Sequence, residues 1–318
     1  MESSGISDGR VILDWLAFTL PSESGLESAE FFFGELTPRP MGTKGYSHSA
    51  ELPCGGVVSW SPARPEQKVH VELGSQALGR AAEIDPALRD VRGVVKCIHD
   101  MGGVITRVDF ALDDRAGRLS MDVIGEHIDQ ELLTSRWRKG RKILATLAGQ
   151  GRTFEFGSRR SDSFLRIYDK QAEQLDKGKD DPGEWVRVEL ELKREKADEA
   201  ARRYVQEGEA FVVGLLRGLI EFKERGEDQT KARWAACDWW VAFLEDAEKA
   251  RLSLPKVQPT IERNMAWMEL QWSRTLARVV IAEGGCFDRV HALMDKGSHQ
   301  LKASDQVLIE EYQTRVAA

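Results

Sequence analysis

One segment in the middle of the chain alternates strictly between apolar and charged residues. In residues 164–170, apolar positions alternate with Arg166, Tyr168 and Lys170. Successive side chains of a β-strand point to opposite faces of a sheet, so a period of two predicts a strand with one buried and one polar face. The polar face would carry a single phenol between two cations.

The same alternation recurs in residues 105–113 and 185–193, where the polar positions are largely acidic. The first segment places Asp109 on its polar face, and the second places Glu189 and Glu191 there. An antiparallel sheet that is covered by helices on one side leaves its other face polar. If the three strands share such a sheet, their carboxylates and the phenol converge on one surface.

These residue types are suited to chemistry at a phosphate. The unperturbed pKa of tyrosine is about 10, so nearby positive charge or a metal would have to favour the phenolate before it became a useful nucleophile. Mg²⁺ and Mn²⁺ prefer oxygen ligands, which carboxylates supply. The alternative is that the three polar faces are ordinary solvated surface.

The pattern along the rest of the chain indicates an α+β fold. Residues 1–194 are expected to form an antiparallel sheet with helices on one face, and residues 195–318 an all-α region with apolar residues at helical spacing. Five of the nine tryptophans lie in that second region, where core packing is expected. The strands are expected at residues 11–20, 56–60, 69–74, 104–113, 153–156, 164–169 and 185–193, and the intervening helices at 27–36, 86–101 and 120–132.

Four blocks of the chain carry a family resemblance, and they stand in the family's order and spacing. They are Arg107–Asp114, Phe154–Arg159, Arg166–Lys170 with Glu173 and Gln174 following, and Trp185–Leu190. On these blocks the chain resembles replication initiation factors of the Rep-trans family, which includes rolling-circle plasmid initiators, phage initiators and the relaxases of some integrative elements. The architecture of such proteins is similar to that of the wider group of tyrosine nucleases.

The resemblance implies a metal-dependent endonuclease and strand transferase that acts on one strand of an origin. It assigns the nucleophile to Tyr168 and implies a covalent 5′-phosphotyrosine intermediate, with Mg²⁺ or Mn²⁺ as cofactor. The metal ligands would be acidic: Asp109, Glu189 and Glu191. Further positive charge at the phosphate would come from the basic residues Arg166, Lys170 and Arg187.

The same resemblance bears on biological role and partners. It implies initiation of rolling-circle replication at origin DNA, duplex and single-stranded, by a homodimer that works with a host helicase. The alternatives are a relaxase of an integrative or conjugative element with the same chemistry, and a noncatalytic origin-binding protein that keeps the fold. The helical region would then serve in packing, dimerisation or origin recognition.

Two other groups of residues compete for these roles. His70 and Glu72 share one face of a predicted strand and form a second potential source of metal ligands. Of the other tyrosines, Tyr204 and Tyr312 lie in helical segments, whereas Tyr46 follows a glycine-containing loop and is a potential DNA contact. No His-X-His pair is present among the six histidines.

Charge is unevenly distributed along the chain. The net charge is −7, which argues against indiscriminate coating of DNA. Residues 134–170 nevertheless contain ten basic and three acidic residues, and Trp137 lies within the basic run 136–142. We therefore expect a DNA-facing loop or hairpin beside the nucleophile. No apolar run is long enough to cross a bilayer and no signal peptide is evident, so we expect residence in the bacterial cytoplasm.

Overall fold

A large antiparallel sheet forms the centre of the fold in this computed structural model, which describes residues 5–7, 9–138, 140–144, 151–245, 249–252 and 260–317. Within that part of the chain the sheet has ten strands. In spatial order they are β2 (Thr37–Pro38), β3 (His48–Glu51), β4 (Val57–Trp60), β5 (Val69–Gly74), β1 (Val11–Leu20), β6 (Val104–Asp114), β11 (Val186–Lys193), β10 (Ser163–Asp169), β9 (Arg152–Gly157) and β8 (Gly140–Leu144).

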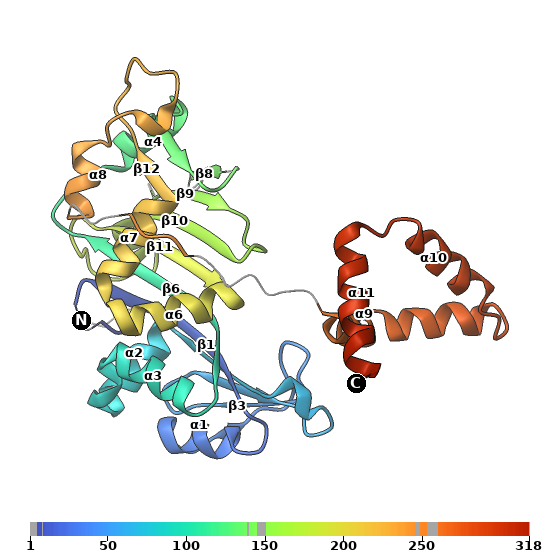
Figure 1. Cartoon of the computed structure of the whole chain (residues 1–318). Coiled ribbons are helices and arrows are strands. Elements are labelled where there is room, and N and C mark those ends of the chain that lie inside the picture. Colours follow the sequence, from blue (N-terminus) through green and yellow to red (C-terminus); the bar gives the residue numbers. More distant parts are fainter. Residues whose placement is uncertain are drawn as a thin grey trace. The chain divides into compact units, whose positions relative to one another are not determined.

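Alternation along the strands gives this sheet one apolar face, and helices cover it (Figure 1). Phe110 of β6 packs against Tyr204 with ring centroids 5.3 Å apart, which joins the sheet to its helical layer. The expected α+β architecture, with helices on one face, is confirmed. The helices of this part are α1 (Gly25–Phe33), α2 (Ser75–Ile84), α3 (Val91–Asp100), α4 (Met121–Asp129), α5 (Lys170–Asp176), α6 (Glu195–Glu207), α7 (Glu209–Leu219) and α8 (Asp238–Phe243).

A second, two-stranded sheet takes one of its strands from the region that the sequence predicts to be all-α. β7 (Leu133–Ser135) pairs with β12 (Ile220–Phe222), which follows α7 directly. The region after residue 194, expected to be all-α, therefore begins with two helices and a strand. The break after α6 is at Gly208, which has a φ of 72°, a conformation that glycine adopts readily.

The chain divides into two compact units, Met1–Leu254 and Pro255–Ala318. The division falls later than the boundary expected after residue 194, because α6 and α7 pack on the sheet and belong to its core. The second unit consists of α9 (Ile261–Ala282), α10 (Asp288–Ser298) and α11 (Ala303–Ala317). Trp240 of the first unit is fully buried, as expected, whereas Trp267 and Trp272 of the second are about half exposed.

None of the helices in the described ranges is long and apolar enough to cross a membrane. The longest of them, α9, is interrupted by charged residues throughout its 22 residues.

Candidate active site

Strand order and register bring the three alternating segments together on the face that carries no helical layer. β11 lies between β6 and β10, with Glu191 opposite Asp109 and Glu189 opposite Arg166. Residues that are directly opposite in an antiparallel pair point to the same face. The predicted convergence of phenol, cations and carboxylates on one surface is therefore what the structure shows.

Tyr168 lies near the end of β10, with its hydroxyl between a carboxylate and an ammonium group. The phenol donates a hydrogen bond to Oε2 of Glu189 (3.1 Å) and accepts one from Nζ of Lys170 (3.3 Å). Tyr168 is 8% exposed, and both hydrogen bonds of its hydroxyl are buried. The arrangement offers the phenolic proton an acceptor, Glu189, and the developing negative charge an ammonium partner.

The electrostatics of Tyr168 differ from the sequence-based expectation. Burial raises the pKa of Tyr168 above its ordinary value, Glu189 raises it further, and Arg187 opposes the shift. Positive charge therefore does not by itself produce a phenolate. Desolvation of a buried group outweighs the neighbouring cations, and the phenol stays protonated until its proton is transferred.

Lys170 begins α5 and is buried beside the phenol. Its Nζ lies 2.5 Å from Oε2 of Glu173, one turn along the helix. Burial lowers the pKa of Lys170, Arg187 lowers it further, and Glu173 opposes both effects. Asp169 caps this helix by accepting a hydrogen bond from the backbone N–H of Ala172 (2.8 Å). The cap and the first turn therefore fix the ammonium against Tyr168.

Arg187 is opposite Tyr168 in the register but has no exposed surface. Its guanidinium donates two hydrogen bonds to Asp113, of 2.6 and 2.8 Å, and one to Asp14 (2.6 Å). These bonds raise the pKa of Arg187 despite its burial. Arg187 therefore holds neighbouring strands together through its ion pairs. It is buried beneath the site and does not reach a phosphate from the surface.

Asp14 was not predicted from the sequence. It is an extra residue in a β-bulge of β1, where Leu13 pairs with Phe110 and Trp15 pairs with Asp109. A bulge re-aims one side chain, here toward Arg187, and bulges often occur next to active sites. A charged residue within the otherwise apolar run of β1 is the signal that would have revealed it.

The three carboxylates predicted as metal ligands are each paired with arginine. Arg107 bridges Asp109 (2.6 Å) and Glu191 (2.8 Å), and Arg166 binds Glu189. Among the residues that the structure describes, no group of three or more His, Cys, Asp or Glu side chains is arranged to hold a metal ion. The carboxylates share a face, but a ready-made cage of three is not present.

The chemistry of this donor set nevertheless fits a hard cation. Burial raises the pKa of Asp109 to about 7, with Arg107 opposing the shift and the neighbouring Glu189 and Glu191 adding to it. Oε1 of Glu191 is buried and forms an ion pair with Nζ of Lys193, so a cation already lies at this oxygen. Mg²⁺ typically takes one or two carboxylates and completes its shell with water and substrate phosphate, so a complete protein cage is not required.

The competing residues are occupied elsewhere. Glu72 forms an ion pair with Lys44, and His70 stacks on Tyr46 with ring centroids 6.0 Å apart. β1 separates their strand, β5, from the strand of Asp109. The Tyr46 hydroxyl donates to the backbone oxygen of Gln67 (3.1 Å). None of these side chains joins the group around Tyr168.

Comparison with known proteins decides the family. The model of a family described as replication initiation factor (Rep_trans) matches residues 103–294, a range that includes Tyr168 and the predicted cations and carboxylates around it. The chain belongs to the Rep_trans family. The family assignment made from the four sequence blocks is thus confirmed.

Two relatives of this Rep_trans protein extend the comparison. A Bacillus subtilis (strain 168) protein named "Putative DNA relaxase NicK" is 26% identical over 191 residues, which are 57% of this chain and 54% of the relative. The chain thus spans about half the length of that curated relative. A rolling circle replication initiator protein from Geobacillus stearothermophilus has a similar solved structure, with a TM-score of 0.63, 25% identity, and coverage of 77% of this chain and 98% of the other.

Part of the predicted basic run lies outside the described residues. Lys139 is not described, nor are the side chains of Arg141 and Lys142. The backbone of residues 140–144 forms β8, the edge strand of the sheet. In the described residues, β8 pairs antiparallel with β9, and Arg136 and Trp137 lie just before β8.

Proposed function

We propose that this protein nicks one strand of DNA and rejoins it through a covalent bond to Tyr168. The observation that carries the proposal is the position of the Tyr168 hydroxyl, which donates to Glu189 and accepts from Lys170 on the polar face of the sheet. A nucleophile held between a proton acceptor and a cation is the arrangement that covalent catalysis requires. Membership of the Rep_trans family supports the same chemistry.

In the forward step, the Tyr168 oxygen attacks the scissile phosphorus and its proton passes to Oε2 of Glu189. The bond between phosphorus and the 3′ oxygen breaks, and that oxygen takes a proton from solvent. The products are a 5′-phosphotyrosine and a free 3′-hydroxyl, which can prime a polymerase. Because the phosphodiester is exchanged rather than hydrolysed, a 3′-hydroxyl can later reverse the step and reseal the strand.

Two cations are placed to stabilise the charge that builds up on the phosphate. Arg166 is partly exposed and Lys170 lies within hydrogen-bond distance of the reacting oxygen. We propose that both cations stabilise the negative charge of the transition state. Arg187 we assign as a positioning residue, because it is buried and bonded to Asp14 and Asp113.

A bound divalent cation would supply polarisation of a non-bridging phosphate oxygen. Asp109 and Glu191 are the residues best placed to hold the cation. Arg107 forms ion pairs with both, which shows that one positive charge can lie between the two carboxylates. Glu189 was predicted as a third metal ligand. It accepts a hydrogen bond from the phenol, and we assign it as the acceptor of the Tyr168 proton. Loss of nicking in EDTA, with recovery on adding Mg²⁺ or Mn²⁺, is the expected result; full activity in the chelator would contradict a metal role.

The biological setting that we propose is initiation of rolling-circle replication, with origin DNA as substrate, a homodimer as the working form and a host helicase as partner. The name of the Bacillus relative favours a second setting, transfer of a mobile element by a relaxase. Both use the same chemistry. In either setting, the unit Pro255–Ala318 is the part that we assign to dimerisation or origin recognition, since it exposes several large apolar side chains.

The decisive experiment looks for DNA on the nucleophile. The protein is incubated with supercoiled circular DNA that carries a candidate origin, then digested with protease and analysed by mass spectrometry. We expect an oligonucleotide attached to the peptide that contains Tyr168. Nicked DNA with no adduct would assign the cut to activated water, and neither nick nor adduct would favour a noncatalytic origin-binding protein.

A further inference from the structure

A pocket of about 370 Å³ lies on the opposite face of the sheet from Tyr168. Its floor includes Leu192 of β11, which belongs to the apolar face, and Ser163 at the start of β10, which is opposite Leu192 in the register. Tyr168 follows Ser163 by five positions, which is about 16 Å along β10. The pocket is therefore distinct from the proposed active site.

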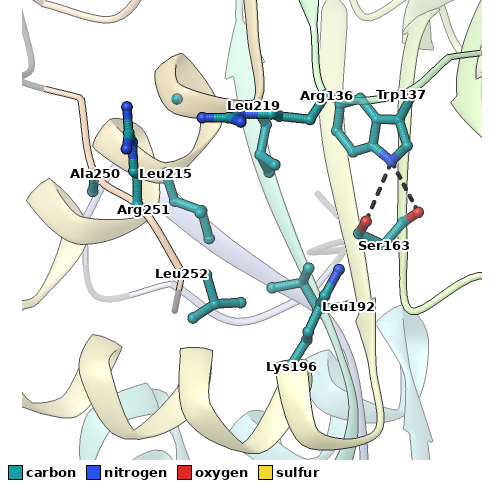
Figure 2. Close-up of a pocket in the computed structure, with 11 residues that line it drawn as sticks. Arg136, Trp137, Ser163, Leu192, Lys196, Leu215, Leu219, Ala250, Arg251 and Leu252 are labelled. Atoms are coloured by element: carbon teal, nitrogen blue, oxygen red, sulfur yellow. Dashed lines mark hydrogen bonds between the residues drawn. The ribbon is translucent and has the colours of Figure 1, made fainter. Parts of the chain in front are cut away.

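The walls of the pocket are apolar and its rim is basic (Figure 2). Leucines from α7, β11 and the segment after residue 249 form the walls. The rim carries Arg136, Lys196 and Arg251, and no carboxylate lines the pocket. Within the described ranges none of these three side chains forms an ion pair, whereas the charged groups around Tyr168 are paired with one another. Three cations without partners on one rim favour an anionic ligand.

Trp137 gives one side of the pocket a fixed aromatic surface. Its indole N–H donates to the backbone oxygen of Ser163 (3.0 Å) and also lies 3.3 Å from the hydroxyl, as Figure 2 shows. The N–H is therefore already used, and what the residue offers a ligand is its ring. An aromatic ring beside basic groups is the combination that binds unstacked bases of single-stranded nucleic acid.

We infer that this pocket binds one unstacked nucleotide of single-stranded DNA, with its phosphates on Arg136, Lys196 and Arg251 and its base against Trp137. The inference rests on the proposed function, because the nicked strand would be the ligand. Arg136 and Trp137 immediately precede β8, the edge strand, and only β9 lies between β8 and β10. A DNA strand that leaves the polar face can therefore reach the pocket by passing around this edge of the sheet. Binding in the pocket would hold one DNA end away from Tyr168.

Cross-linking tests the location. A photoreactive benzophenone amino acid replaces Leu219 in the full-length chain, which is irradiated with a short fluorescein-labelled single-stranded oligonucleotide. We expect labelled protein from this position and none from the control position Ile84, an exposed apolar residue on α2. Leu252 is the alternative position if the Leu219 variant does not fold. No label at Leu219 and Leu252, or equal labelling at Ile84, would overturn the inference.

Binding measurements test the chemistry. Lys196→Glu is expected to weaken oligonucleotide binding about tenfold. It should also lower the slope of log affinity against log salt by about 0.7, the value for one phosphate contact in a single strand. Arg89→Glu, an equivalent charge reversal at an exposed position on the helical side, should do neither. Equal affinity and slope in Lys196→Glu and the parent protein would sink the inference.

A failure here is distinguishable from a failure of the proposed function. The same preparations are assayed for the covalent adduct on Tyr168. An adduct without cross-linking at Leu219 or Leu252 removes the pocket from the DNA path and leaves the nicking chemistry intact. Absence of the adduct in the parent protein removes the nicking chemistry itself.

Discussion

The two faces of the central sheet use charge in opposite ways. On the polar face, Arg107, Arg166 and Arg187 are paired with carboxylates from neighbouring strands, so charge holds side chains in place. On the helical face, the cations of the pocket rim have apolar neighbours. Paired charges position a site at a cost in desolvation, whereas unpaired cations on a rim remain available to a ligand. The contrast separates a region built for chemistry from one suited to binding.

The largest effect is expected on the polar face from Tyr168→Phe. Removal of the hydroxyl leaves no other nucleophile in the group around Glu189, so nicking of supercoiled origin DNA should fall by at least about a thousandfold. Binding to the same DNA, measured by fluorescence anisotropy, should stay nearly unchanged because only one oxygen is lost. Nicking at the parent rate would assign the nucleophile to another residue.

Arg187→Met tests how much the buried ion pairs contribute to the stability of the fold. The variant leaves the carboxylates of Asp14 and Asp113 without their buried partner, so the free energy of unfolding in urea should fall by about 3–5 kcal/mol. Lys96→Met is the control, since it breaks only an exposed pair with Asp100 and should lower the free energy of unfolding far less. Similar losses in both variants would mean that the buried network contributes little.

The pH dependence of stability tests the crowded carboxylates. The pKa of Asp109 is about 7 in the fold and near 3.8 ordinarily, so between these values the folded chain keeps a proton that the unfolded chain releases. Stability from this group is present below pH 4 and is lost as pH rises toward 7. Relative to Asp109→Asn, the parent protein should lose up to about 1.4 kcal/mol per pH unit in that window. Parallel curves from urea titrations would argue against the shift.

The smallest effect is expected at the pocket. Trp137→Phe removes the hydrogen bond to Ser163 and should lower the free energy of unfolding by about 1 kcal/mol more than Trp60→Phe. The indole N–H of Trp60 has no hydrogen-bond partner among the described residues, so it is a suitable reference. Equal losses would show that the Trp137 ring is held by packing alone, and that the helical face has no polar anchor at this point.

Much of the sheet follows from local pattern. The segments 11–20 and 69–74 are strands with the predicted bounds. Residues 69–74 alternate cleanly between buried and partly exposed positions, whereas residues 11–20 form a largely apolar run that is interrupted by the bulge at Asp14. The short strand β12 was not predicted, since its three apolar and acidic residues also fit a helix. Only its partner, β7, makes the extended form favourable by supplying backbone hydrogen bonds.

Part of the candidate site can likewise be predicted from the sequence, and part of it cannot. Tyr168 and Glu189 stand out because alternation places both on polar faces. Asp14 reaches Arg187 only through a bulge, and a bulge depends on how β1 pairs with β6. The raised pKa of Tyr168 likewise depends on burial, which neighbouring cations in the sequence do not reveal.

The sequence by itself determined which residues share the polar face, since side-chain direction in a strand follows from the period of two. The same pattern, with the four motif blocks, also determined the family. Only the tertiary structure decided which carboxylate meets the phenol, that Arg187 is a buried clamp, and that three cations border a pocket on the helical face. These features depend on strand order, register and packing between distant segments, which are set by the whole fold.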